Sequence, residues 1–337
     1  MAYKIENRRY TGSKAKLVGW IMSLIDKECS GKVFLDIFAG TGVVAAAAAS
    51  NSFRHVIVND LLYSNYASFK AFFGKGEWDG GKLKKIVDNY NNVDSKDIKE
   101  NFFSKNFGDK YFNLETAKII GFIRDKIEKD KAKLTEKEYF ILLASLMYSA
   151  DKVANTVGHY DAYIRKKPKD SKFYMKLIEP IKVKKIDIFR EDSNLLVKNL
   201  RADVVYIDPP YNSRQYSRFY HVLETLIKGD TPKLYGVALK PEPENMSDYC
   251  RVKAPEVFGD LIKNLACKYI VVSYNNTYNS KSNSSRNKIK LEQIRQILES
   301  RGETKIFNKT HRFFNSGKTS FENHQELIFI TKVNAKK

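Results

Sequence analysis

An apolar run that ends in an acid, two prolines and an aromatic residue constrains the fold more than any other stretch of this chain. Val204 to Ile207 have the continuous apolar character of a strand that is buried on both faces of a parallel sheet. The two prolines that follow lack backbone N–H groups and fix φ, so the chain must leave the sheet as a stiff loop. Asp208 and Tyr211 are therefore expected at the carboxyl end of a strand, where open α/β sheets place their active sites.

The residues at this strand end suit the methylation of an amino group on an aromatic base. The N6 lone pair of adenine is delocalised into the ring and is a poor nucleophile. The carboxylate of Asp208 and the backbone carbonyl of Pro209 can each accept one N6 hydrogen, which localises the lone pair toward an incoming methyl group. Tyr211 can supply a stacking face for the base. The alternative is a purely structural strand end with a turn-forming proline pair.

A second strand end has the pattern of a nucleotide-binding loop. Residues 33–44 read VFLDIFAGTGVV, which predicts a buried strand, a glycine-containing turn and an alanine-rich helix. Gly40 and Gly42 allow the backbone to approach a ligand closely, and Asp36 can accept hydrogen bonds from an ammonium group. The third glycine of the dinucleotide fingerprint is absent, which favours a ligand without a phosphate. A structural strand-to-helix turn is the alternative.

Two further acids follow predicted strands. Asp60 ends an apolar strand 24 residues after Asp36, at the place where a carboxylate commonly accepts the hydroxyls of a ribose. Asp192 follows a short strand that precedes the catalytic one, so it can accept from the amino group of a cofactor's adenine. Asp187 and Glu191 compete with Asp192 for that role.

A long insertion with helical periodicity separates the two strand-end motifs. Residues 63–185 show no strand alternation and are too many for a connecting loop in a compact sheet, so they predict a helical domain. Within it, residues 151–167 mix amides, aromatic rings and cations, as suits contacts to base edges and phosphates. A solvated helix surface is the alternative. The candidate nucleic-acid contacts here are Asn155, Tyr160, Tyr163, Arg165, Lys166 and Lys167.

The charge of the chain indicates a polyanionic partner. Its 337 residues carry 59 Lys and Arg against 39 Asp and Glu, a formal net charge of +20. Residues 268–318 are especially basic, with eleven cations against three acids. Phosphate contacts are therefore also expected outside the insertion, and the candidates are Arg214, Arg286, Lys288, Arg312 and Lys318.

Cysteine and histidine usage favours a reduced protein without a metal. The three cysteines and five histidines are too few and too scattered for a disulfide framework or a metal cluster. No signal peptide or membrane-spanning run is evident, so a cytoplasmic protein is expected.

In combination, these motifs and their order resemble the alpha group of DNA adenine-N6 methyltransferases, the Dam-like D12 class, in which a target-recognition domain sits inside the catalytic fold. The resemblance implies an α/β fold with a Rossmann-like class I methyltransferase sheet, formed by residues 1–62 and 186–337, and a recognition insertion over 63–185. It implies S-adenosyl-L-methionine (AdoMet) as cofactor and double-stranded DNA as substrate. Carried over by residue, it places Tyr10 and Lys14 against the cofactor, Asp60 on its ribose, and Asp208 at both cofactor and base.

Two departures from the family pattern keep the required chemistry: a tryptophan is frequent where this chain has Tyr10, and glutamate is frequent where it has Asp36. The residues after Tyr211 are also similar to type II modification methylases of short palindromes, CATG readers among them. A modification enzyme of bacterial or phage origin is expected, with a restriction endonuclease encoded nearby.

Other functions remain possible at this point. An RNA adenine-N6 methyltransferase would use the same tetrapeptide and the same positive charge. Cytosine-N4 enzymes usually have Ser where Asp208 stands, and protein glutamine methyltransferases usually have Asn. A non-catalytic nucleic-acid-binding module on the same scaffold would not need the complete set of acids and glycines.

Overall fold

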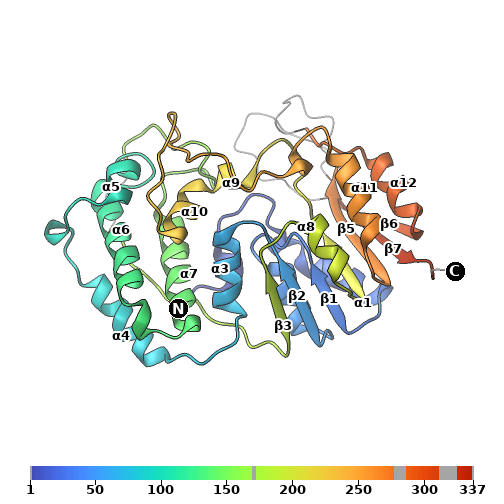
Figure 1. Cartoon of the computed structure of the whole chain (residues 1–337), viewed down its shortest axis with the longest axis horizontal. Coiled ribbons are helices and arrows are strands. Elements are labelled where there is room, and N and C mark those ends of the chain that lie inside the picture. The colour runs from blue at the N-terminus through green and yellow to red at the C-terminus, as the bar shows by residue number, and fades with distance from the viewer. Residues whose placement is uncertain (1, 169–171, 277–285, 311–324, 336–337) are drawn as a thin grey trace. The chain divides into compact units, whose positions relative to one another are not determined.

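The computed structural model describes residues 2–168, 172–276, 286–310 and 325–335 (Figure 1). These residues form two compact units. A sheet unit contains Lys14–Leu61, Lys184–Tyr216 and Asn245–Lys337, and a helical unit contains Met1–Ser13, Leu62–Val183 and Ser217–Glu244. Within the described ranges, no helix has the length and apolar character needed to cross a bilayer.

A seven-stranded mixed sheet is the framework of the sheet unit, and its strand order is β3-β2-β1-β4-β5-β7-β6. Strands β1 to β5 run parallel, whereas β7 pairs antiparallel with β5 and β6 antiparallel with β7. The expected α/β fold class is confirmed. The strands are β1 (Val33–Asp36), β2 (His55–Asn59), β3 (Ile186–Phe189), β4 (Val204–Ile207), β5 (Tyr269–Asn275), β6 (Gly302–Thr310) and β7 (Gln325–Val333).

The strand order places the two sequence motifs side by side. Strand β1 lies between β2 and β4, so the chain reverses its direction of sheet growth between β1 and β4. Asp36 pairs with Tyr206 in the register of these strands, and Asp208 follows two residues later. Because ligands of open α/β sheets bind at such a switch point, the carboxyl ends of β1 and β4 are the expected site.

Apolar helices cover the sheet and bury the strands that carry the site. Leu35, Val205 and Val272 belong to one buried cluster with Phe258 of α11 and Leu298 of α12. The α-helices of this unit are α1 (Val18–Glu28), α2 (Val43–Ser50), α8 (Ser193–Leu196), α11 (Ala254–Asn264) and α12 (Leu291–Glu299).

The helical unit is built around α7 (Glu136–Val153), which contacts α3, α6 and α10. Every residue of α7 from Lys137 to Asp151 is buried, so this helix is the core of the unit. Thr135 and Glu138 form a reciprocal capping box at its start. The other helices are α3 (Tyr63–Phe72), α4 (Gly80–Asn91), α5 (Phe102–Phe107), α6 (Leu114–Lys129) and α10 (His221–Lys228), and a short α9 (Tyr216–Phe219) precedes α10.

The helix formers of residues 212–227, which follow Tyr211, predict a helix that packs back on the sheet. This prediction is wrong, because α10 packs within the helical unit. The carboxylate of Glu224 accepts from the N–H groups of Tyr63 at 3.1 Å and Ser64 at 2.7 Å, at the start of α3. The apolar face of α10 finds its partners on α3 and α7, which sequence periodicity alone does not reveal.

The compact units also divide the chain differently from the predicted domains. The predicted insertion covers 63–185 alone, whereas Met1–Ser13 and Ser217–Glu244 group with it in the structure. Both segments are held by long-range polar contacts. The guanidinium of Arg124 on α6, for example, donates to the carbonyls of Leu226 at 2.9 Å and Lys228 at 3.0 Å, at the end of α10.

The Arg124 contact predicts a stability effect. Arg124→Ala should lower the free energy of unfolding by about 2–3 kcal/mol, because buried carbonyls at the end of α10 lose a charged donor. Urea unfolding measures this change. Lys129→Ala, at the exposed end of the same helix, is the control and should change stability by less than about 0.5 kcal/mol. Equal effects of the two substitutions would contradict the assignment.

Candidate active site

A buried acid at the end of β1 has no hydrogen-bond partner. Asp36 is 1% exposed, and neither carboxylate oxygen has a partner with hydrogen-bond geometry among the described residues. The Ala45 amide of α2 lies close enough to lower the pKa of Asp36 slightly. Burial, followed by the charges of Asp208 and Asp60, nevertheless raises this pKa well above its usual range. A carboxylate kept in such surroundings is typical of a site that a ligand's donor group completes.

The turn after Asp36 is shaped by glycines and held by Asp60. Gly40 has φ 54° and Gly42 has φ 82°, both in the left-handed region that favours glycine. The N–H of Gly40 donates to Asp60 Oδ2 at 2.9 Å, so the ends of β1 and β2 are joined. Asp36 and Asp60 therefore lie near the same glycine turn, and their contact with a cofactor stays a prediction.

Asn59 is a positioning residue that sequence reasoning missed. Its side chain is fully buried, and its amide nitrogen donates to the carbonyls of Ile37 and Glu191, each at 3.1 Å. Its amide oxygen accepts from the Glu191 N–H at 3.0 Å. Asn59 thereby fixes the chain beyond β1 and β3 relative to β2. A polar residue at the last position of an apolar strand was the available signal.

Asp192 has a structural role in addition to the one predicted. It caps α8, where its Oδ1 accepts from the N–H groups of Asn194 at 2.9 Å and Leu195 at 3.1 Å. The competing Asp187 pairs with His55 at 2.6 Å. Contact between Asp192 and a cofactor's adenine stays a prediction.

Asp208 is engaged by two side chains at the end of β4. Its side chain is 17% exposed, and its Oδ2 lies 3.0 Å from Nζ of Lys14, which is 5% exposed. The hydroxyl of Tyr211 donates to Asp208 Oδ1 and accepts from Lys14 Nζ at 2.7 Å. The Tyr211 ring meets Tyr274 of β5 edge-on with ring centroids 4.7 Å apart, and Pro209, which follows Asp208 in the chain, is buried. Lys14, Asp208 and Tyr211 thus form one cluster, the strand-end cluster.

The charges of this cluster are mutually dependent. Burial raises the pKa of Asp208, while the Lys14 ammonium and the Tyr211 hydrogen bond oppose that rise. Burial alone would lower the pKa of Lys14, but the negative charges of Asp208 and Glu326 outweigh it and raise that pKa. Lys14 therefore stays protonated and is the main group that favours the ionised form of Asp208. Glu326 on β7 is buried, and its part in the site was not predicted from the sequence.

Tyr10 and the basic loop of residues 154–167 belong to the helical unit. Tyr10 stacks on Tyr220 with ring centroids 4.5 Å apart, and Arg8 lies 5.2 Å from the Tyr10 ring centroid. The predicted contact between Tyr10 and the cofactor stays a prediction.

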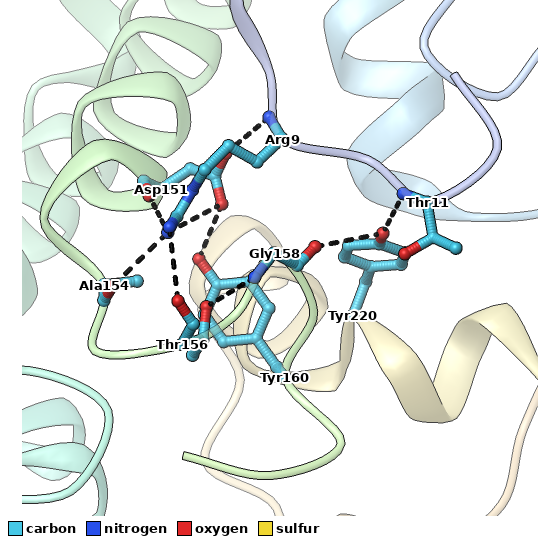
Figure 2. A network of polar contacts seen from close by, with 8 residues as sticks. All are labelled: Arg9, Thr11, Asp151, Ala154, Thr156, Gly158, Tyr160 and Tyr220. Carbon is cyan, nitrogen blue, oxygen red and sulfur yellow. Dashed lines mark hydrogen bonds and ion pairs between the residues drawn. The ribbon is translucent and has the colours of Figure 1, made fainter. Parts of the chain in front are cut away.

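Figure 2 shows how the N-terminal segment holds the loop that follows α7. The Arg9 side chain donates to the carbonyls of Asp151, Ala154 and Thr156, and so caps the carboxyl end of α7. The Asp151 carboxylate accepts from the Arg9 N–H at 2.8 Å and from the Tyr160 hydroxyl at 2.9 Å. Tyr220 accepts from the Thr11 N–H at 2.7 Å and donates to the Gly158 carbonyl at 3.4 Å. The loop is thereby fixed to the unit that carries it.

Two of the predicted nucleic-acid contacts have structural roles. Tyr160 is 0% exposed and its hydroxyl is bound to Asp151, so its side chain is not available to a base. Asn155 is half-buried and its side-chain amide donates to the backbone carbonyls of Lys110 at 2.9 Å and Ile164 at 2.8 Å, and its contact with DNA stays a prediction. Tyr160 was assigned wrongly because loop residues of this composition can close the loop as readily as they can contact a ligand.

The other candidates are placed as follows. Arg165, Lys166 and Lys167 are consecutive and exposed, and Tyr163 is half-buried with its ring 5.2 Å from that of Tyr111. In the sheet unit, Arg214 is half-buried, Arg286 is exposed, and the Lys288 N–H donates to the Tyr211 carbonyl at 2.8 Å. Arg312 and Lys318 lie outside the described residues. DNA contact by the accessible residues stays a prediction.

The residues beyond β1 fit an organic cofactor with an ammonium group. The unpartnered carboxylate of Asp36 and the left-handed glycines beside it provide an acceptor and a close backbone approach. Among the described residues, no group of three or more His, Cys, Asp or Glu side chains is arranged to hold a metal ion.

Substitution of Asp36 should stabilise the protein. The pKa of Asp36 is higher in the folded state than in the unfolded state, where it is about 4. The wild type therefore loses stability as the pH rises from the unfolded-state pKa through the folded-state pKa. Asp36→Asn removes this loss. Its free energy of unfolding should exceed that of the wild type by about 1–2 kcal/mol at pH 8 and by less at pH 4. Urea unfolding at both pH values measures the effect. Glu303→Gln, an exposed acid of β6, should show neither change, and a destabilised Asp36→Asn would refute the prediction.

Comparisons with known proteins agree with this geometry. The model of the D12 class N6 adenine-specific DNA methyltransferase family matches residues 10–281. The chain is 34% identical to the modification methylase StsI of Streptococcus sanguinis over 80% of its own length and 44% of that protein. It is 32% identical to the type II methyltransferase M.NlaIII of Neisseria lactamica, over 94% of its own length and 95% of that protein.

The match covers different shares of the relatives' lengths. The chain is 31% identical to the type II methyltransferase M.FokI of Planomicrobium okeanokoites over 96% of its own length and 52% of that protein. It thus spans about half the length of the StsI and M.FokI enzymes and nearly all of M.NlaIII. The family match and these identities, together with the paired strand-end motifs, show that this chain belongs to the D12 class of N6 adenine-specific DNA methyltransferases.

Proposed function

We propose that the chain transfers the methyl group of AdoMet to N6 of an adenine flipped out of duplex DNA, as the modification enzyme of a restriction-modification system. The observation that carries this proposal is the adjacency of a buried and a partly buried carboxylate at the ends of neighbouring strands. Asp36, at the end of β1, is unpartnered, and Asp208, at the end of β4, is bound to Lys14. One acid suits the ammonium group of the donor, and the other suits the amino group of the acceptor.

The cofactor side of the site consists of β1, β2 and the glycine turn. In this proposal Asp36 accepts from the ammonium group of AdoMet, and the turn at Gly40 and Gly42 allows the backbone to approach it. Asp60 accepts from the ribose hydroxyls, and Asp192 from the adenine amino group. AdoMet supplies an activated methyl group on its sulfonium, so the protein needs no covalent intermediate.

The acceptor side consists of the strand-end cluster. Asp208 and the Pro209 carbonyl each accept one N6 hydrogen of the target adenine, and the positive charge that develops on N6 is stabilised by the carboxylate. Lys14 keeps that carboxylate ionised. Because the sulfonium is already activated, Asp208 acts chiefly by position and charge rather than as a strong base.

Tyr211 must rearrange when the base enters. Its hydroxyl is bound to Asp208 and Lys14, and its ring meets Tyr274. Entry of adenine replaces the hydroxyl hydrogen bond with one from N6 and lets the ring stack on the base. Extrusion of the base costs a few kcal/mol, about what stacking and phosphate contacts restore.

The biological assignment rests on the relatives. Those named above are modification methylases or type II methyltransferases, which favours a role beside a restriction endonuclease that recognises the same sequence. Such an enzyme acts where genomic DNA is, in the cytoplasm of a bacterium or of a virus-infected cell. Direct contact with the endonuclease is not required.

Removal of the acceptor carboxylate tests the reaction. Asp208→Ala should lower methyl transfer to duplex DNA by at least about 10³-fold, because N6 loses the acceptor that localises its lone pair. DNA binding should persist, as shown by titration of a labelled duplex. Glu303→Ala should retain full activity. Near-normal turnover of Asp208→Ala would contradict the mechanism, and transfer by the wild type to ribosomal RNA but not to duplex DNA would contradict the substrate.

Replacement of Lys14 should shift the pH dependence of methyl transfer. The titratable groups that interact with Asp208 are Lys14, Tyr211, Tyr206, Asp36 and Glu326. Among them, Lys14 is the cation, and its charge lowers the pKa of Asp208. In Lys14→Met the pKa of Asp208 should rise, so the acid limb of the pH profile of the single-turnover rate should move to higher pH.

A variant that keeps the positive charge distinguishes the electrostatic effect of Lys14 from its packing. Lys14→Arg should keep the acid limb near its wild-type position, because it retains a cation beside Asp208. A rate loss in Lys14→Met that is uniform at all pH values would contradict the electrostatic role. Profiles of single-turnover methyl transfer at saturating AdoMet and DNA measure the shift.

A further inference from the structure

A loop that follows the catalytic tetrapeptide in the chain is fastened to the basic loop of the helical unit. The hydroxyl of Tyr111 lies 2.9 Å from the Tyr160 carbonyl and 2.9 Å from the Ala238 carbonyl. His221 Nε2 contacts the same Ala238 oxygen at 2.8 Å, and Lys240 pairs with Asp161. Residues 155–167 and 233–240, here called the paired-loop surface, therefore form one structural element.

The tip of the second loop is a tight, regular turn. Tyr235 and Lys240 pair antiparallel, with N–H to carbonyl distances of 2.8 and 3.0 Å, and the Leu239 N–H donates to the Gly236 carbonyl at 3.1 Å. Gly236 has φ 67° and Leu239 has φ 53°, so the turn depends on two left-handed residues. A backbone fixed in this way holds the side chains of the tip in defined positions.

This ordered turn displays apolar side chains to solvent. Val237 is 82% exposed and Tyr235 is 42% exposed, with Lys233 5.3 Å from the Tyr235 ring centroid. Val157 and Ile164 of the first loop are also 42% and 40% exposed. Four of the six large apolar side chains that the described part of the helical unit exposes thus lie on the paired-loop surface. Such concentration marks an interaction surface rather than scattered exposure.

The charge of the surface favours a polyanionic partner. Arg165, Lys166 and Lys167 are consecutive and exposed on the first loop, and the acid between the loops, Asp161, is paired with Lys240. The acid just beyond the second loop, Glu242, is engaged by the Tyr235 hydroxyl. Cations beside exposed aliphatic and aromatic groups match a DNA groove, where phosphates flank base edges and thymine methyl groups. A protein partner of acidic character is the competing occupant, and the test below separates the two.

We propose that the Tyr235–Lys240 turn is a base-reading element of target recognition, with Val237 and Tyr235 in contact with base edges while Arg165 to Lys167 contact phosphates. This inference rests on the proposed function. It adds to target recognition a segment that lies outside the insertion predicted from the sequence, because residues 233–240 come after the catalytic motif. The side chain of Val237 selects among base pairs by apolar contact and contributes no phosphate contact.

The test compares two exposed valines in the full-length protein. The cognate duplex is taken from the methylation pattern of DNA in expressing cells, and binding is titrated on it and on duplexes with single base-pair changes, with S-adenosylhomocysteine present. Val237→Ser should weaken cognate binding about tenfold and reduce discrimination against at least one changed base pair. The salt dependence of binding should not change, because no cation is lost. Val252→Ser, at a 91% exposed position of the sheet unit, is the matched control and should bind as the wild type does.

The outcomes are distinct. If Val237→Ser and Tyr235→Ser both bind and discriminate as Val252→Ser does, the proposal is overturned and the surface serves another partner. A loss of affinity that is equal on every duplex also overturns it, because the turn then reads no bases. Thermal melting should be unchanged for these exposed substitutions. The proposed function fails separately, if the wild type transfers no methyl group to adenine in duplex DNA.

Discussion

The juxtaposition of Asp36 and Asp208 is the constraint on which the sheet unit depends. The two acids, Asp36 buried and Asp208 partly buried, repel each other and lose hydration, so each raises the free energy of the ligand-free protein. Lys14 compensates one of them, and Asp36 is left without a partner. The fold sustains this arrangement because β1 and β4 lie in a sheet whose apolar core fixes their register. The protein is thus less stable at the ends of β1 and β4, where the proposed function places the charged methyl donor and the adenine that accepts the methyl group.

The acids of the site are held in position by polar contacts from neighbouring residues. Asn59 fixes the chain beyond β1 and β3, the Gly40 N–H binds Asp60, and Lys14 fixes Asp208. These contacts orient the acids without a metal ligand set among the described residues. In the proposed reaction Tyr211 first releases Asp208, after which the carboxylate is already in position to stabilise the charge that develops on N6.

The sheet and the principal acids were predictable because their signals are local. A buried strand that ends in VVYIDPPY can leave the sheet in few ways, and the glycine turn after Asp36 requires left-handed backbone at Gly40 and Gly42. The role of Glu326 was not predictable, since β7 enters the site only through its pairing with β5. The placement of Ser217–Glu244 was also missed, because the partners of α10 are far away in sequence.

The candidate DNA contacts show the same limit. Tyr160 lies in a segment whose composition is typical of nucleic-acid contacts, but its side chain is buried against Asp151. The paired-loop surface arises only when Tyr111 and the Lys240–Asp161 pair join two loops about 75 residues apart, which no periodicity indicates. Sequencing of DNA from cells that express the protein, with base modifications detected, tests the proposed transfer to adenine in DNA. N6-methyladenine at one short sequence is the expected result. N4-methylcytosine, or DNA without modification beside methylated RNA, would contradict the proposal.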